Sequence, residues 1–219
     1  MTRRLLLPLL ALALLSPLPA RAAPEAQLWL EGGVRYRPVK ELWLSFDQHL
    51  RWDNDLTRLR KIMPELGLRY GVHKNFRAAL GYRLIAEGNN QRQFTTAHRV
   101  MLDLLPRYRV GEVTLAYRAR LQLTSGASGS GDPLEPVLRQ RIGLAYGTEL
   151  GVEPFVEAEL YLQLGGGTTG ATKWRLTLGA AYSIADHDCE LFYRVQRPIG
   201  DPNPDTWHIL GLGYRFSIR

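Results

Sequence analysis

The sequence has little cysteine and no long apolar segment beyond its first residues. Its one cysteine, Cys189, has no second thiol with which to form an intramolecular disulfide. After residue 15, no stretch approaches the roughly 20 consecutive apolar residues of a membrane-spanning helix. These absences exclude a disulfide scaffold and a bundle of membrane helices. They leave membrane β-barrels open, because only alternate residues of a barrel strand are apolar.

The common signatures of metal, nucleotide and nucleic-acid sites are also missing. No His and Cys residues cluster at metal-ligand spacing. The glycine-rich segment 165–170 lacks the lysine and the following helix of a phosphate-binding loop. The formal net charge of +7 is mild, and falls to about +4 without the three arginines of the leader described next. We therefore expect no metal, no cofactor and no nucleic-acid partner.

The first 22 residues have the pattern of a secretory signal peptide. Arginines at positions 3 and 4 precede an apolar run over residues 5–15, and Ala-Arg-Ala at residues 20–22 fits a cleavage site. The run is too short to span a bilayer. We expect an exported chain with a cleaved signal peptide over residues 1–22 and one domain over residues 23–219.

The last segment, residues 206–219, alternates between an apolar and a polar face. Tyr214 and Phe216 lie near the end of the apolar face, whereas the other face carries glycines and Arg215. The Gly-x-x-Tyr-x-Phe pattern that starts at Gly211 resembles the C-terminal signal that the barrel-assembly machinery of bacterial outer membranes recognises. Three residues follow Phe216, which is a small departure from the usual aromatic ending. The segment predicts a barrel strand and that machinery as a partner.

Eleven segments of the mature chain alternate in this way, each about 10 residues long. That length crosses a bilayer at the tilt of a barrel strand. The pattern predicts an all-β fold, a transmembrane antiparallel β-barrel of about 10–12 strands. Single-chain bacterial barrels usually have an even number of strands. An odd count means that the first segment is not a wall strand, that two strands have been merged, or that the N-terminus starts at the outer rim. The segments span residues 28–36, 42–52, 62–70, 76–84, 100–108, 113–123, 138–146, 152–162, 174–182, 191–195 and 206–219.

The connections between these segments alternate between short and long, as in outer-membrane barrels with short periplasmic turns and longer outer loops. The short ones lie near residues 38–40, 72–74, 110–112, 148–151 and 185–188. The long ones are rich in residues that favour turns and lie at 53–57, 86–97, 124–136, 165–172 and 198–205. Three prolines inside the segments remove a ladder donor, and predict bulges or local breaks at Pro64, Pro106 and Pro154.

A tyrosine ends the apolar face of every second segment, just before its short turn. Tyrosine prefers the membrane interface, where its ring is in the acyl boundary and its hydroxyl is in water. Trp52 and Trp174 lie at the opposite ends of their segments and fit an outer girdle. Cys189 shares the apolar face. The pattern predicts insertion in the outer membrane of a Gram-negative bacterium, in contact with lipid and lipopolysaccharide. The interface aromatics are Tyr36, Tyr70, Tyr108, Tyr146, Tyr182 and Tyr214.

The polar face of the segments is rich in arginine. An Arg or Lys on the lipid face costs about 2–4 kcal/mol at the midplane of the bilayer, so these side chains are expected to face the lumen. The residues that would line an anion path are Arg77, Arg83, Arg99, Arg107, Arg118, Arg120, Arg139, Arg141 and Arg175. The lumen acids are Asp103, Glu153, Glu157 and Glu159. The three glutamates lie between Arg139 and Arg141 on the preceding segment and Lys173 and Arg175 on the following one.

These charges allow more than one function. Cross-strand ion pairs would fill a narrow lumen and give a structural or interaction protein that does not conduct. Unpaired arginines would instead give a narrow porin that prefers anions or acidic oligosaccharides. Acids are sparse across the three segments from residue 76 to 123, so its lining would include Arg77, Arg83, Arg99, Arg107, Arg118 and Arg120. A soluble lipid-binding barrel is the architectural rival, and it requires apolar faces that point inward.

An enzyme is the least favoured alternative. Ser45, Asp47 and His49 share one face and are the residue types of an acyl-transfer triad. Alternate residues on a strand are roughly 6.5 to 7 Å apart, whereas a triad needs contacts near 3 Å. We therefore expect no enzymatic activity, with an outer-membrane acyl hydrolase as the remaining possibility.

Several short motifs also carry a family resemblance. They are Gln27-Leu28-Trp29, His98-Arg99 and Arg118-Ala119-Arg120, together with MPELGLRYGV, FRAALGYRL and the terminal WHILGLGYRFSI. These resemble the uncharacterised barrel family catalogued as domain of unknown function 2490, over nearly the whole mature chain. The resemblance implies an outer-membrane barrel and no established activity. The family usually has an acid before the His-Arg and after the Arg-x-Arg, where this chain has Ala97 and Leu121. This departure implies a less balanced charge cluster.

Overall fold

The structure is a computed structural model that describes residues 26–53, 56–89, 93–125, 134–165, 169–202 and 204–218. The expected signal peptide, residues 1–22, lies outside the described residues. No helix long and apolar enough to cross a membrane occurs in the part of the chain that is described.

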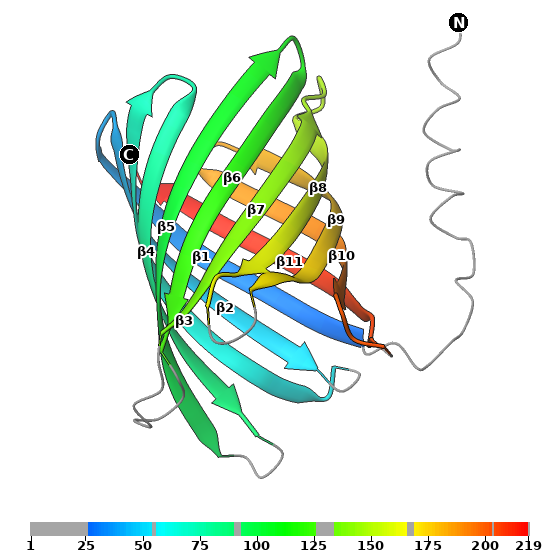
Figure 1. Ribbon diagram of the computed structural model, residues 1–219. Helices are drawn as coiled ribbons and strands as arrows, with labels where there is room; N and C mark the ends of the chain where they lie inside the picture. Colours follow the sequence, from blue (N-terminus) through cyan, green and yellow to red (C-terminus); the bar gives the residue numbers. More distant parts are fainter. Residues whose placement is uncertain are drawn as a thin grey trace, which may run out of the picture.

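Eleven strands form one closed barrel (Figure 1). Each strand pairs in antiparallel fashion with the next one in the sequence, and β1 closes the barrel against β11. The predicted all-β barrel and the count of eleven strands are therefore confirmed. The strands are β1 (Ala26–Val39), β2 (Leu42–Asp53), β3 (Arg58–His73), β4 (Phe76–Gly88), β5 (Phe94–Val110), β6 (Val113–Thr124), β7 (Glu135–Tyr146), β8 (Val152–Gln163), β9 (Gly170–Ile184), β10 (His187–Pro198) and β11 (Trp207–Ile218).

The closing pair, β1 with β11, is parallel. Its register runs from Ala26 opposite His208 to Tyr36 opposite Ile218. An odd number of strands in an up-and-down barrel requires this, because the first and last strands then run in the same direction. Of the three possibilities left by the sequence, the one that starts the N-terminal strand at the rim of the long loops is correct. Figure 1 shows the C-terminus at the opposite end of this seam, with the short turns.

All five short connections lie on one rim, called the short-turn rim, and the long connections lie on the other, the long-loop rim. Gly111 and Gly151 have φ values of 56° and 75° in the short turns, which explains glycine there. Ala185 has a φ of 52° in the turn between β9 and β10, where most residues other than glycine are strained. The predicted segregation of short and long connections is confirmed.

The three strand prolines interrupt the ladders only locally. The pairing of β3 with β4 skips Pro64, and that of β5 with β6 skips Pro106, but the register is the same on both sides of each gap. Pro154 lies just beyond the end of the ladder between β7 and β8. Of the two alternatives expected at the prolines, bulges or local breaks, the structure has local breaks at Pro64 and Pro106. The register shifts occur elsewhere, as between Arg51 and Trp52, because a missing donor removes one bond without adding a residue.

The outer surface of the barrel is apolar. Leu66, Ile142 and Leu212 are between 49% and 58% exposed, and the six tyrosines of the predicted girdle are 41% to 60% exposed near the short-turn rim. Cys189 is exposed on the same surface and pairs with both Tyr182 and Tyr214. This orientation is the reverse of a soluble lipid-binding barrel, which places its apolar faces inside.

Candidate functional site

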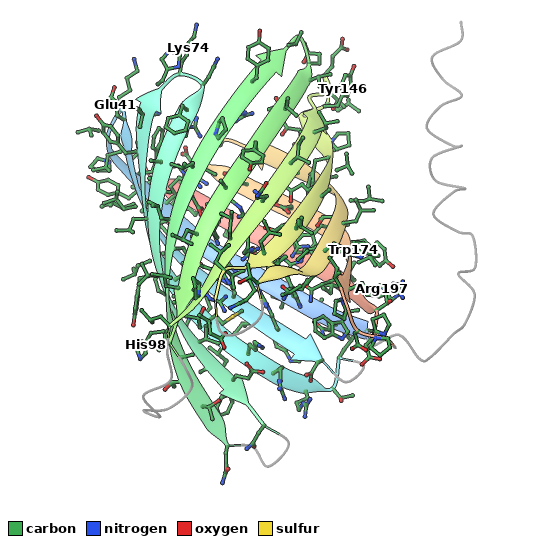
Figure 2. All side chains as sticks on the ribbon, in the orientation of Figure 1. Glu41, Lys74, His98, Tyr146, Trp174 and Arg197 are labelled. Carbon is green, nitrogen blue, oxygen red and sulfur yellow. The ribbon has the colours of Figure 1, made fainter. Side chains whose placement is uncertain are left out.

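The lumen contains two successive layers of side chains, which follow from the alternation of each strand. The charged layer is formed by Glu31, His49, Glu65, Arg83, Asp103, Arg120, Arg139, Glu159 and Arg194. One inward position nearer the long-loop rim, the apolar layer is formed by Trp29, Met63, Ile85, Met101, Tyr161 and Ile209. Nearer the short-turn rim the inward positions are mostly small residues or unpaired charges. Figure 2 labels Glu41, Lys74 and Tyr146 at this open rim.

Glu159 of β8 is the centre of the charged layer. Its carboxylate accepts hydrogen bonds from Arg118 at 2.5 Å, Arg139 at 3.0 Å and Arg175 at 3.1 Å. The Tyr161 hydroxyl donates a further bond at 3.0 Å. Glu159 is only 5% exposed. Three guanidinium groups around one buried carboxylate form a cluster in which removal of the acid would leave uncompensated positive charge.

Two more ion pairs complete the charged layer. Arg120 donates to both oxygens of Asp103, at 2.6 and 2.7 Å, in the two-toothed geometry that suits a guanidinium. Arg83 is paired with Glu65 and also contacts the His49 ring at 3.2 Å. Arg83 and Asp103 are each 6% exposed. Charge-assisted bonds in the layer therefore link β2, β3 and β4 in one group and β5 through β9 in another.

The apolar layer fills the lumen on the long-loop side. Ile209 is fully buried, Met63 and Met101 are 1% exposed, and Trp29 is 3% exposed, although all four point away from the apolar outer surface. The guanidinium of Arg51 lies 3.8 Å from the centre of the Trp29 ring. Cation–π contact of this kind lets an arginine pack against an aromatic ring without a carboxylate. Trp29 and Ile209 pack in one buried cluster with Phe192, and the other members of the layer are at most 6% exposed.

Two cavities occupy the lumen on the other side of the apolar layer. The first has a volume of about 290 Å³, and its lining runs from Trp29 and Arg51 past the charged layer to residues such as Arg35, Trp43 and Arg69. The second has a volume of about 380 Å³ and lies at the short-turn rim. It is called the rim chamber and is lined by Arg69, Lys74, Arg77, Arg107, Glu153 and Glu190, among others. Neither cavity is lined by Lys61, Glu87 or Lys173, the charged residues on the long-loop side of the apolar layer.

Glycines keep the short-turn half of the lumen hollow. A Cβ atom at Gly211 would overlap the Phe192 ring, and one at Gly179 would overlap the Phe155 ring. Each ring therefore lies flat over a glycine of the neighbouring strand, instead of pointing to the centre of the barrel. Ala79, Ala116 and Ala181 add small inward side chains at a similar depth.

Five arginines near the short-turn rim have no carboxylate partner within the described part of the chain. They are Arg35, Arg37, Arg69, Arg77 and Arg107. The guanidinium of Arg77 lies 5.1 Å from the centre of the Trp43 ring, which also receives Arg37 at 4.8 Å. Arg69 is within electrostatic range of Arg35 and Arg77. The short-turn half of the lumen therefore carries positive charge that the fold does not neutralise.

The structure separates the predicted path arginines into three groups. Most are bound to carboxylates: Arg83, Arg118, Arg120, Arg139, Arg141 and Arg175. Arg99 donates to the Thr124 hydroxyl at 2.9 Å. Arg77 and Arg107 remain unpaired. The expectation that acids are sparse around β4 to β6 is wrong in space, because Glu65 of β3 and Glu159 of β8 reach arginines of those strands across the interior.

The predicted acids are divided in a similar way. Asp103, Glu157 and Glu159 form ion pairs, with Arg141 at 2.7 Å from Glu157. Glu153 has no ion pair among the described residues. Both neighbouring strands predicted to pair with the glutamates contribute an arginine to Glu159, which is Arg139 from β7 and Arg175 from β9. Lys173 instead lies over the Tyr161 ring at 4.4 Å.

The apolar layer was not predicted. Its signal is present in the sequence, since Trp29, Met63 and Met101 have the same parity as the inward arginines. Apolar residues on a polar face indicate depths at which the lumen is packed.

Ser45, Asp47 and His49 all face the lumen but do not form a triad. Asp47 accepts two hydrogen bonds from Arg215, at 2.9 and 3.1 Å. The His49 ring lies 3.4 Å from Glu31 and 3.6 Å from Glu65, and no contact with Ser45 is present. Among the described residues, no group of three or more His, Cys, Asp and Glu is placed to hold a metal ion.

The family model described as "Protein of unknown function (DUF2490)" matches residues 26–206, which is most of the chain. The chain belongs to this family. No curated protein matches it. The motifs that suggested the family contribute to the interior: Trp29 lies in the apolar layer, and Arg118 and Arg120 bind Glu159 and Asp103. Both arginines of that motif are balanced, despite Leu121. His98 instead points outward and bonds the Tyr82 hydroxyl at 2.7 Å.

Proposed function

We propose that this member of the DUF2490 family is an outer-membrane barrel whose lumen is closed to solutes, with a structural or interaction role and no enzymatic activity. The observation that carries the proposal is the pair of layers across the lumen. The charged layer is bound together by Glu159, Asp103 and Glu65, and the apolar layer beside it is almost fully buried. An open pore requires neither arrangement.

The apolar outer surface supports the membrane location. Contiguous exposed apolar area on this scale is unfavourable in water and favourable against lipid. The exposed tyrosines near the short-turn rim fit a membrane interface. With the short turns in the periplasm, the C-terminal strand would be available to the barrel-assembly machinery, and the outer surface would contact lipid and lipopolysaccharide.

The positions of Ser45, Asp47 and His49 support a non-enzymatic role. The carboxylate of Asp47 is bound by Arg215, and His49 is held between Glu31, Glu65 and Arg83. A serine nucleophile needs a base within hydrogen-bond reach, and none of these contacts supplies one.

Conductance in a planar bilayer tests closure. We expect the refolded wild type to give no channel steps, because solutes meet the apolar layer. The double variant Trp29→Ala and Tyr161→Ala should give steps, since both rings lie in that layer. Trp174→Ala is the matched control, because Trp174 is 37% exposed on the outer surface; it should stay silent. Stable steps in the wild type would contradict the proposal.

The second candidate is a narrow anion-preferring porin, favoured by the unpaired Arg77 and Arg107. In that case wild-type steps would be anion-selective in a salt gradient. Arg118→Glu with Arg120→Glu would weaken the preference. A silent wild type that has folded, as judged by heat-modifiable migration in gels, would reject the porin.

A further inference from the structure

Two walls of the rim chamber carry unpaired charges of opposite sign. Arg69, Arg77 and Arg107 come from β3, β4 and β5, and Glu153 and Glu190 come from β8 and β10. In the closed order of strands, β4 and β9 are on opposite sides of the ring. All five residues line the same cavity. The charges therefore face each other across the chamber.

These charges do not neutralise one another. No ion pair within 4.0 Å joins either glutamate to any of the three arginines. In the same lumen, closer charges do pair, as Arg141 does with Glu157 at 2.7 Å on neighbouring strands. The cavity of about 380 Å³ separates the two walls, and its volume is within the range of small-molecule sites.

The arrangement is costly for the fold alone. Like charges at close range repel, and Lys74 adds to the positive wall. Glu190 is exposed within the lumen, so its carboxylate is available to a ligand. Unsatisfied charge at a hollow site is where proteins give up stability for binding. A ligand can also come close to the backbone there, because the small residues Ala116, Ala181 and Gly143 line the chamber.

We propose that the rim chamber binds a small zwitterion with a phosphate group at one end and an ammonium group at the other, entering from the short-turn rim. Three guanidinium groups match a phosphate monoester or diester, whose anionic oxygens accept paired bonds from arginine. The ammonium group faces Glu153 and Glu190. Beyond the two cavities the lumen is filled by the apolar layer, so the site binds and does not transmit. The last point rests on the proposed closed lumen; the binding itself does not.

Titration calorimetry in a nonionic detergent tests the site. The probes are O-phosphoethanolamine, inorganic phosphate, ethanolamine and dihexanoyl phosphatidylethanolamine. We expect O-phosphoethanolamine to bind at least tenfold more tightly than phosphate, and ethanolamine to give no signal. Binding of the soluble zwitterion indicates a free ligand, whereas binding of the lipid alone indicates a headgroup; both support the proposed chemistry. If neither O-phosphoethanolamine nor dihexanoyl phosphatidylethanolamine binds at millimolar concentration, the proposal is overturned.

Variants of the two walls separate their roles. Arg69→Gln, Arg77→Gln and Arg107→Gln together should weaken binding of every phosphate probe at least tenfold. Glu153→Gln with Glu190→Gln should remove the preference for the zwitterion and leave phosphate binding unchanged. Arg109→Gln is the matched control, because Arg109 is on the same strand as Arg107 but bonds the Gly111 carbonyl and does not line the chamber. If the triple variant bound the phosphate probes as tightly as the wild type does, the assignment would be overturned.

Tryptophan fluorescence gives a second readout of binding, which needs less protein from variants that fold poorly. Trp43 contacts Arg77, so a phosphate bound by Arg77 should change tryptophan fluorescence, and Trp43→Phe should abolish the change. Heat-modifiable migration confirms the fold of each variant. These results are independent of conductance: binding together with wild-type channel steps would reject the closed lumen and keep the site.

Discussion

The two halves of the lumen differ in how the same strand positions are used. Toward the long-loop rim, inward positions carry large side chains such as Trp29 and Met101, and arginines are paired or stacked on rings. Toward the short-turn rim, many inward positions carry glycine or alanine, and several charged residues, such as Arg77 and Glu153, have no ion pair among the described residues. The comparison shows that the long-loop half of the lumen is packed like a protein core, whereas the short-turn half contains the cavities.

The difference has an energetic basis. A barrel of eleven strands is wider than the eight-stranded barrels whose interior side chains just fill the space. Long side chains from several strands are needed to close it. Arginine serves here because its stem packs while its guanidinium binds a carboxylate or a ring. Where the inward residues are small, there is room for solvent to screen the charges, which lowers the cost of leaving them without a partner.

The largest expected effect is the loss of the central carboxylate. Glu159→Gln leaves Arg118, Arg139 and Arg175 without their shared charge, and should lower the free energy of unfolding by about 3–5 kcal/mol. Urea unfolding followed by tryptophan fluorescence measures this. Glu157→Gln is the control, because Glu157 pairs only with Arg141 in the more open half. Equal effects of the two substitutions would mean that the charged layer has no special role.

The next effect comes from the apolar layer. Ile209→Ala removes a fully buried side chain, and should lower the free energy of unfolding by about 2–5 kcal/mol through lost burial and the cavity left behind. Leu210→Ala is the neighbouring control, with a side chain that is 49% exposed on the outer surface. A larger loss for Leu210→Ala in the same urea experiment would contradict the assignment of inside and outside.

A smaller effect is expected from filling the glycine positions. Gly211→Ala places a Cβ atom against the Phe192 ring and should cost about 1–3 kcal/mol, as overpacking does. Gly213→Ala is the matched control on the same strand face, since its nearest neighbour would be the Glu190 Cβ at 3.4 Å. Thermal unfolding of both variants compares them. The idea fails if Gly213→Ala is the more destabilising substitution.

The smallest effect has the opposite sign. Removing the unpaired charge with Arg69→Gln, Arg77→Gln and Arg107→Gln should raise the free energy of unfolding by no more than about 1 kcal/mol at low salt, since like charges in solvent repel weakly. The gain should fade at high salt because the repulsion is screened. A clear loss of stability would show that these arginines support the fold.

Much of the fold could be predicted from alternation alone. The parity of residues such as Leu66 and Arg69 decides which face meets the outside, and turn-forming residues locate the connections. The count of eleven strands and the separation of short from long connections are confirmed on this basis. The local breaks expected from the strand prolines are present at Pro64 and Pro106, which remove a bond without shifting the register.

The candidate site could be predicted only in part. Parity identified the inward arginines, but it could not assign their partners. Arg118 binds Glu159 from a strand two positions away, and Arg83 binds Glu65 as well as contacting His49. Such contacts depend on the length of each side chain and on the depth at which it enters the lumen. Neither follows from the sequence of a single strand.

By itself, the sequence determined that the chain is an all-β barrel, which residues face inward, and which rim has the short turns, because each of these follows from local periodicity and turn chemistry. Only the tertiary structure decided that β1 closes on β11 in parallel, that Glu159 gathers three arginines, and that one half of the lumen is filled while the other is hollow. These features depend on strands distant in sequence, whose relative depth is set by the closure of the sheet.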